Sequence, residues 1–285
     1  MRLIKPSFEI LEQQPSYRGL MQHIERCGRT CYKSEDKITE DSAEKFVKML
    51  VNRGHTAMVE HGTIYLTLNM TNRQEYFKYC ANKYSEAISE GEAEKGTWVG
   101  YITTNYRVLL QNDWLGDLQY LTEPTKHIRR ITVKFVCDRG VSHEFVRHRV
   151  FSFAQESTRY CNYAKDKFGN EVTFIIPCWL GWDEQNIHYG DFEKSGSGSI
   201  DSGLFINSLL DAEDYYLCLL KEGWKPQEAR AVLPNSLKTE LVMTGTVKQW
   251  EGFFKLRDAN DAHPQARELA QPLHEEFIRR NYINE

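Results

Sequence analysis

Helical and strand-like segments do not alternate regularly along this chain of 285 residues, and their order restricts the folds open to it. Apolar side chains recur at helical spacing in some segments and at every second position in others. The spacing predicts, in chain order, helices at 16–28 and 40–53, a strand at Thr63–Asn69, helices at Arg73–Ile88 and Thr103–Leu118, and a strand at Ile131–Cys137. Because helices follow helices here, we predict an α+β fold with a mixed or antiparallel sheet flanked by helices, rather than a doubly wound parallel sheet.

The second half of the chain continues this irregular order. We expect a short helix at Val141–Val150, a strand at Val172–Ile176, a flexible loop at 194–199, an apolar helix at Leu204–Leu220, a strand at Leu241–Val247, and helices at Trp250–Leu256 and Gln265–Asn281. No internal repeat occurs. A chain of this length is long enough to bury a real core, and we treat residues 1–285 as a single domain.

The composition is that of an ordinary globular protein, and it argues against several functional classes. Hydrophobic residues make up 41% and charged residues 27%, with a formal net charge of −4, so we expect no nucleic-acid or membrane partner. The N-terminal residues lack the apolar core of a signal peptide, and no window approaches 18 uninterrupted apolar residues. The seven cysteines are scattered without a CxxC pair, which favours a reducing cytoplasm and predicts neither a disulfide framework nor a metal site.

The densest functional-looking stretch is Arg147–Tyr160, where three arginines and a histidine fall within 13 residues of a chain with net negative charge. Arginine offers planar, bidentate donors that fit phosphate and carboxylate oxygens. Two interpretations stay open from the residues alone. One is a phosphate or polyanion site in which Gln155 and Ser157 add neutral hydrogen bonds. The other is a set of surface salt bridges with Glu144 and Glu156.

The spacing within this stretch resembles the signature of the flavin-dependent thymidylate synthases, which is Arg-His-Arg, seven residues and then Ser. Here it stands as Arg147–Arg149 and Ser157, and it continues as Ser-Thr-Arg-Tyr. Three further segments resemble the same family: Gly54–His61 its Gly-His-x-(Ser/Thr)-x-x-Glu-His segment, Glu228–Pro234 its Ala-Arg-x-x-Leu-Pro segment, and Leu256–Pro264 its Leu-Arg…His-Ala-Gln region. The resemblance covers residues 1–70 and 130–280, which leaves 71–128 as an insertion that we expect to be helical.

The resemblance implies the reductive methylation of dUMP to dTMP. In this family methylenetetrahydrofolate gives the carbon, reduced FAD gives the hydride, and NADPH recharges the flavin. The resemblance also implies a homotetramer whose active sites are assembled from several subunits.

The resemblance further assigns roles to individual residues. Those expected to bind dUMP are Glu144, Arg147, Gln155, Ser157, Thr158, Arg159, Arg230 and Arg257. Those expected to bind FAD are His55, Thr56, Arg147, His148, Arg149, Gln155, Thr246, Lys248, Gly252 and Asp261. Arg257 is the expected catalytic residue, because a fixed cation stabilises uracil ionised at N3 without exchanging a proton. Ser157 is expected to form hydrogen bonds and not to act as a nucleophile, since no acidic residue is visibly placed to orient His148 as its base.

Several positions depart from the commonest residues of the family. Thr246, Lys248 and Gly252 fall where shorter members often carry Asn, Arg and Asn, Asp261 replaces a usual His, and Cys31 replaces a common Ser near the flavin phosphates. Lysine keeps the charge of arginine but loses its bidentate fork. Two other functions therefore stay open: a flavin-binding paralogue of other activity, and an RNA- or DNA-binding module that combines the arginine cluster with neighbouring aromatic side chains.

Overall fold

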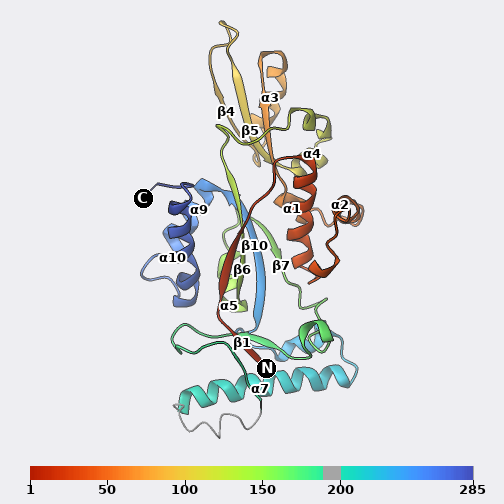
Figure 1. The fold of residues 1–285 in the computed structure, drawn as a ribbon, viewed down its shortest axis with the longest axis vertical. Helices are drawn as coiled ribbons and strands as arrows, with labels where there is room; N and C mark the ends of the chain where they lie inside the picture. The colour runs from red at the N-terminus through yellow and green to blue at the C-terminus, as the bar shows by residue number, and fades with distance from the viewer. Residues whose placement is uncertain (189–199, 285) are drawn as a thin grey trace.

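The computed structural model describes residues 1–188 and 200–284, and the loop predicted at 194–199 lies outside the described residues. The molecule is elongated, with a central sheet, a sheet-containing arm at one end and a long helix across the other (Figure 1). Helices and mainly antiparallel strand pairs occur without regular β–α alternation, which confirms the predicted α+β class. No helix among the described residues is both long and apolar enough to cross a membrane.

The central sheet is antiparallel and holds the largest core. Its strands lie in the order β2 (Ser7–Leu11), β6 (Arg130–Asp138), β10 (Lys238–Thr246) and β7 (Ser152–Gln155). The strand predicted at Ile131–Cys137 is confirmed as β6, and the strand predicted from Leu241 begins earlier, at Lys238. Alternate residues of β6, such as Phe135, pack against Trp250 and Phe253 of the following helix layer.

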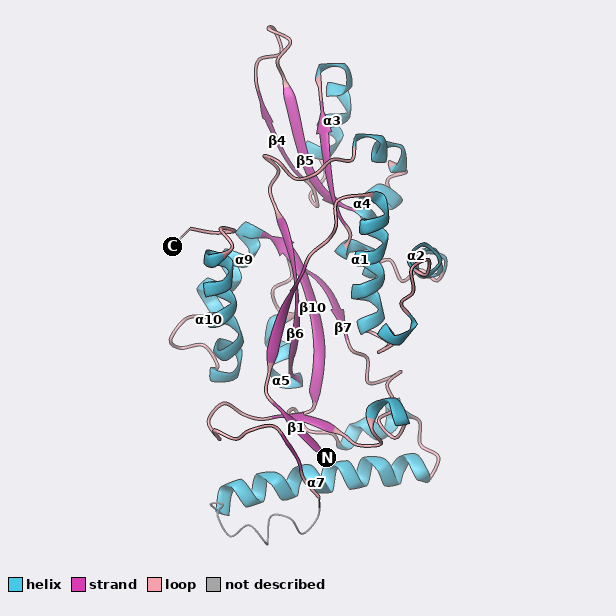
Figure 2. Ribbon diagram, in the orientation of Figure 1, coloured by secondary structure: helices cyan, strands magenta, loops and turns pink. Residues whose placement is uncertain are grey.

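Helices cover both faces of the central sheet (Figure 2). One face carries α5 (Arg139–Phe145), α9 (Val247–Arg257) and α10 (Pro264–Arg279), while the other carries α1 (Tyr17–Thr30), with α2 (Ala43–Asn52) packed against α1. The side chain of Ser16 caps α1 by accepting a hydrogen bond from the Gly19 amide at 2.9 Å. Gly54 follows α2 with a φ of +72°, the conformation expected of a glycine that ends a helix.

Segment 71–128 forms the arm together with β3 (Thr63–Leu68), and it supplies two strands of a second sheet beside its helices. The helices predicted at Arg73–Ile88 and Thr103–Leu118 are therefore present but shorter than predicted. The sheet has the order β3, β5 (Val99–Asn105) and β4 (Glu86–Glu90), flanked by α3 (Arg73–Cys80) and α4 (Tyr106–Gln111). Asn82 ends the helical run, because its side chain accepts from the Tyr84 amide at 2.9 Å and forms a turn. Residues 103–105 pair with β3 instead of starting a helix, which begins only after Asn105 caps it.

The third sheet lies at the other end of the molecule, beside the long helix. It has the order β8 (Thr173–Ile175), β1 (Arg2–Ile4) and β9 (Gln185–Asn186), and α7 (Ile200–Lys221) packs near it (Figure 1). A short helix, α8 (Pro226–Ala229), precedes β10. Single 3-10 turns lie at η1 (Glu35–Lys37), η2 (Met58–His61), η3 (Met70–Asn72), η4 (Leu115–Tyr120), η5 (Asp166–Phe168) and η6 (Arg230–Val232).

A buried chain of polar side chains ties the helices to the central sheet. His23 Nε2 lies 3.0 Å from Thr132 Oγ1, which lies 2.8 Å from Thr244 Oγ1, and this hydroxyl lies 2.7 Å from His61 Nδ1. Burial is the main reason that the pKa of each histidine is lowered to about 3, and the nearby charge of Arg130 lowers both further. Both imidazoles are therefore neutral in the folded protein at neutral pH.

The two histidines make the fold sensitive to acid. Between pH 6.5 and 3 the unfolded chain binds protons at these side chains and the folded chain does not, so stability is lost as the pH falls. At pH 5 each histidine lowers the free energy of unfolding by about 2 kcal/mol relative to neutral pH. The loss of stability is the difference between the free energies of unfolding in urea at pH 7.5 and at pH 5. We expect His61→Asn to remove about half of this difference.

The exposed histidine at position 143 offers a matched control for that comparison. The His143→Gln protein should keep the full pH-dependent loss of the parent protein. An unchanged loss in the His61→Asn protein would show that His61 does not cause the acid sensitivity.

Candidate active site

Arg257 is the centre of a hydrogen-bonded cluster built from α9 and the end of α5. Its Nη1 lies 2.5 Å from Glu144 Oε2, its Nη2 donates to the Glu144 carbonyl at 2.9 Å, and its Nε donates to His148 Nε2 at 3.1 Å. Arg257 lies 113 positions from Glu144 and 109 positions from His148 in the sequence. The packing of α9 beside α5 brings the three residues together. The side chain of Arg257 is 17% exposed, so it is held in place without being sealed from solvent.

The protonation states within this cluster follow from its geometry. Arginine can only donate, so Nε2 of His148 must accept and the ring proton lies on Nδ1. Burial, and then the charge of Arg257, lower the pKa of His148 to about 4, which keeps the ring neutral at pH 7. Three of the five N–H donors of Arg257 are used by Glu144 and His148, which leaves two for a ligand.

The part of the signature segment (Arg147–Tyr160) that follows β7 forms a second cluster. Arg230, at the start of η6, donates from Nη1 to Thr158 Oγ1 at 2.8 Å, and Thr158 is buried. The amide of Ser157 donates to the carbonyl of Cys31 at 3.1 Å, which fixes the segment against the end of α1. Two widely separated motifs of the sequence therefore meet at Thr158, as expected if both contact one ligand.

Gln155 connects this segment to the helix that carries Glu144. Its Nε2 donates to Ser142 Oγ on α5 at 2.9 Å and lies 3.3 Å from Thr239 Oγ1 on β10. The thiol of Cys31 faces Met58, and burial raises its pKa to about 11, so it is protonated at neutral pH.

A buried cluster of ion pairs lies beside the signature segment. Glu240 on β10 pairs with three lysines: Lys33 at 2.7 Å, Lys238 at 2.6 Å and Lys134 at 2.6 Å. Lys238 also pairs with the buried Glu156 at 2.8 Å, next to Ser157 in sequence. The three ammonium groups hold the pKa of Glu240 well below its usual range, against the opposing effect of burial.

The segment that follows α2 lies beside the signature segment. The imidazole Nδ1 of His55 is 2.9 Å from the hydroxyl of Tyr32, whose ring is 5.3 Å from that of Tyr160. Thr56 is partly exposed next to His55. Counted along the family pattern, the Ser/Thr position falls on Ala57, and Thr56 is the hydroxyl residue next to it.

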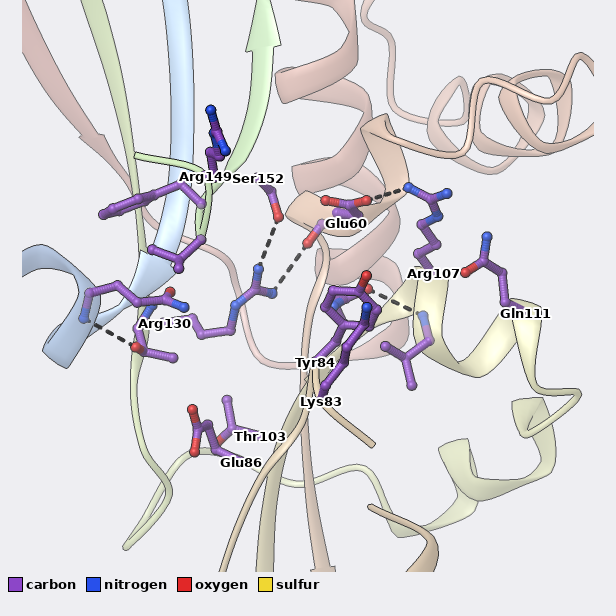
Figure 3. A pocket seen from close by; sticks show the side chains of 16 residues that line it. Glu60, Lys83, Tyr84, Glu86, Thr103, Arg107, Gln111, Arg130, Arg149 and Ser152 are labelled. Carbon is purple, nitrogen blue, oxygen red and sulfur yellow. Dashed lines mark hydrogen bonds and ion pairs between the residues drawn. The ribbon is translucent and has the colours of Figure 1, made fainter. Parts of the chain in front are cut away.

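A cavity of about 460 Å³ opens between the central sheet and the arm (Figure 3). Arg149 and Thr246, two of the residues expected to bind FAD, line it. Thr246 also caps α9, since its Oγ1 accepts from the Gln249 amide at 3.3 Å. Two side chains of the turn Arg147–Arg149 therefore lie in different places. His148 contacts Arg257, and Arg149 lines the cavity.

The structure does not bring every expected site residue into these clusters. Arg147 and Arg159 are exposed at the signature segment, and Lys248, Gly252 and Asp261 are exposed along and after α9. A side chain built at Gly252 would meet nothing within 4 Å, so the space beside it is open. Within the described part of this single chain, nothing closes over these residues.

Arg130 at the cavity and the lysines around Glu240 were not predicted from the sequence. A signal for the second group exists, because Lys238 and Glu240 lie two positions apart in β10 and so share one face of the strand. Arg130 carried no such signal, since it begins β6 directly after the insertion and its position at the cavity depends on the arm.

Comparisons with known proteins identify the family. A family model described as thymidylate synthase complementing protein matches residues 101–280. A flavin-dependent thymidylate synthase from Corynebacterium glutamicum is 31% identical over 268 residues, which covers 91% of this chain and 76% of that relative. The chain therefore belongs to the family of flavin-dependent thymidylate synthases.

Other relatives match over shorter ranges. Flavin-dependent thymidylate synthases from Corynebacterium aurimucosum and Pyrococcus furiosus are 33% and 29% identical over 138 and 147 residues, or 46% and 52% of this chain. The chain spans about half the length of these two relatives, 51% and 53%. A solved structure of the flavin-dependent thymidylate synthase from Helicobacter pylori, complexed with FAD and dUMP, aligns over 94% of this chain and 92% of that one with a TM-score of 0.40 and 15% identity. At so low a TM-score we take no residue role from it.

Proposed function

We propose that this protein reductively methylates dUMP to dTMP, with methylenetetrahydrofolate as carbon donor, FAD as cofactor and NADPH as reductant. The observation that supports this most strongly is the cluster in which His148 of the signature orients Arg257. When bound, reduced FAD supplies the hydride for the reaction. The surrounding protein residues bind, orient and stabilise the nucleotide.

Arg257 is the residue that we propose for the chemistry. Glu144 and His148 fix its guanidinium, and its two remaining N–H donors suit the N3 and carbonyl edge of an ionised uracil. His148 is neutral at pH 7 and adds no positive charge to this cluster. Arg257 is therefore the only group of the cluster that stabilises the uracil anion by its charge. Ser157 has only a hydrogen-bonding role in this proposal.

We propose that Arg230, Thr158, Ser157 and Arg159 bind the dUMP phosphate, with Gln155, Glu144 and Arg147 nearby. Arg230→Gln keeps a hydrogen-bonding side chain but removes the charge, so we expect the Kd for dUMP to rise about 10- to 100-fold in calorimetric titration. Arg18→Gln, on an exposed surface ion pair, should leave the Kd unchanged. Equal affinities of the Arg230→Gln and parent proteins would remove Arg230 from the phosphate site.

The residues around the cavity fit part of a flavin nucleotide. The lining has a surplus of positive charge and includes Arg149 and Thr246. We propose that His55, Thr56, His148, Gln155, Lys248, Gly252 and Asp261 complete the FAD site. Several of these are exposed in a single chain, which supports a homotetramer with active sites shared between subunits. We further propose a single domain over residues 1–285, with the insertion at 71–128, and a cytoplasmic location.

The absorbance spectrum of the purified protein tests cofactor and substrate together. We expect flavin bands that shift when dUMP is added, because dUMP and FAD would meet at the signature segment. A protein that binds FAD with bands insensitive to dUMP would instead be a flavoprotein of other activity. A protein that binds neither would exclude the proposed function.

A further inference from the structure

A groove of about 320 Å³ lies beside the first half of α10, separate from the cavity between the central sheet and the arm. One wall comes from the segment between β1 and β2, another from the segment that follows β8, and Glu268 of α10 completes the lining. Figure 1 shows the start of α10 above the segment that follows β8. None of the residues that line the groove is among those proposed to bind dUMP or FAD.

Glu268 is the group in this groove that the chain itself leaves unsatisfied. Its Oε1 atom is buried and has no hydrogen-bond partner among the described residues. The basic side chain of the groove, Lys5, pairs instead with Asp183, with 2.9 Å between Nζ and Oδ1. A carboxylate oxygen that is removed from water without a donor or a counter-ion is costly, and a bound cation would remove that cost.

The surroundings of Glu268 add negative charge and not positive charge. Asp138, the buried residue that caps α5, accepts from the Val141 amide at 2.6 Å and from the Gln265 side chain at 2.7 Å, so both of its oxygens have partners. Burial, and then the charge of Asp138, raise the pKa of Glu268 to about 7. Burial, and then the charge of Glu268, raise the pKa of the Cys178 thiol in the groove. The groove therefore favours a cation over an anion.

Trp182 adds an aromatic surface that favours one kind of cation. Its ring packs against Phe205 of α7, with 6.4 Å between the ring centroids, and so is held in place. A guanidinium is planar, stacks on aromatic rings and offers paired N–H donors to a carboxylate. An ammonium ion is more strongly hydrated, so it loses more on entering a groove with apolar walls from Pro6, Ile176 and Pro177. The small volume of the groove suits a guanidinium on a short alkyl chain.

We propose that this groove binds an alkylguanidinium, with the guanidinium between Glu268 and Trp182 and the alkyl chain against the apolar walls. A free small molecule and the side chain of an arginine in another polypeptide both carry this chemistry. The proposal is independent of the proposed thymidylate synthase activity, because it uses none of the residues assigned to dUMP or FAD.

Titrations of the purified protein with butylguanidinium, followed by saturation-transfer NMR at pH 8, test this site. We expect a Kd of about 1–10 mM, as for a ligand of so few atoms. Butylurea has nearly the same shape without the charge and should bind at least about tenfold more weakly. Glu268→Gln keeps the volume of the side chain and should weaken butylguanidinium about tenfold. Glu275→Gln is the matched control at an exposed position of the same helix, and it should leave the Kd unchanged.

The pH dependence of binding gives a second measurement, which needs no variant. The guanidinium binds the ionised carboxylate, so the affinity of the parent protein should be about tenfold lower at pH 6 than at pH 8. Glu268→Gln should abolish this difference. A capped arginine peptide identifies the carrier, since tighter binding than that of butylguanidinium indicates a polypeptide and equal or weaker binding a free ligand. No binding of butylguanidinium by the parent protein, equal binding of butylurea, or an unchanged Kd in Glu268→Gln would overturn the inference.

Discussion

Replacing Arg257 by Gln is expected to lower the rate of tritium release from [5-³H]dUMP by about 100- to 1000-fold, the usual effect of removing one preorganised electrostatic group. Glutamine is uncharged and too short to reach both Glu144 and His148 as the guanidinium does. The anion that forms at uracil would then lose its fixed cation. Binding of dUMP in the ground state should weaken much less than turnover, because the phosphate contacts that we propose, Thr158 and Arg230, belong to a separate cluster.

Two comparisons separate chemistry from folding in this experiment. Arg279→Gln removes a guanidinium that is 71% exposed on α10, and it should leave tritium release unchanged. Thermal unfolding of the Arg257→Gln protein shows whether the unpaired Glu144 has damaged the fold. Turnover within about threefold of the parent enzyme, in a folded variant, would refute the catalytic role of Arg257.

Replacing Glu240 by Gln is expected to lower the free energy of unfolding by about 3–5 kcal/mol. The carboxylate is nearly buried among Lys33, Lys134 and Lys238, so its loss leaves three ammonium groups without their shared counter-ion. Glutamine retains the volume of the side chain, which means that the loss reports charge and not packing. Because the cluster supports Glu156, dUMP binding should weaken as well.

Urea unfolding of Glu240→Gln beside Glu92→Gln gives the required comparison. Glu92 pairs with Lys95 on the surface and is 61% exposed, so its replacement should change stability by less than about 0.5 kcal/mol. Similar small effects in both variants would mean that solvent reaches the Glu240 cluster and screens it. A high salt concentration should affect the Glu240 cluster little, since groups shielded from water are weakly screened.

The sequence predicted the elements that carry their own periodicity. The strand at Ile131–Cys137 and the helices at 16–28 and 40–53 are present, because each buries one regular apolar face. The arm was predicted only in part: its helices α3 and α4 are present, but β5 was not predicted because it is a strand by virtue of its pairing with β3, some 40 positions away. Strand formation depends on such partners more than on local propensity.

The candidate site was predictable only in part, for a similar physical reason. From its residues alone the arginine-rich signature left two interpretations open, an anion site and a set of surface salt bridges, and the family resemblance added Arg230 and Arg257. No local pattern indicates that Arg257 contacts His148 or that Arg230 contacts Thr158, since these contacts require α9 and η6 to pack where they do. Arg130 was missed because its neutral partners come from three separate elements.

The most direct test of the central proposal is tritium release from [5-³H]dUMP by the purified protein. We predict release that requires both methylenetetrahydrofolate and NADPH, together with formation of dTMP in equal amount. Absence of release from a folded protein that binds both FAD and dUMP would contradict the assignment as a thymidylate synthase.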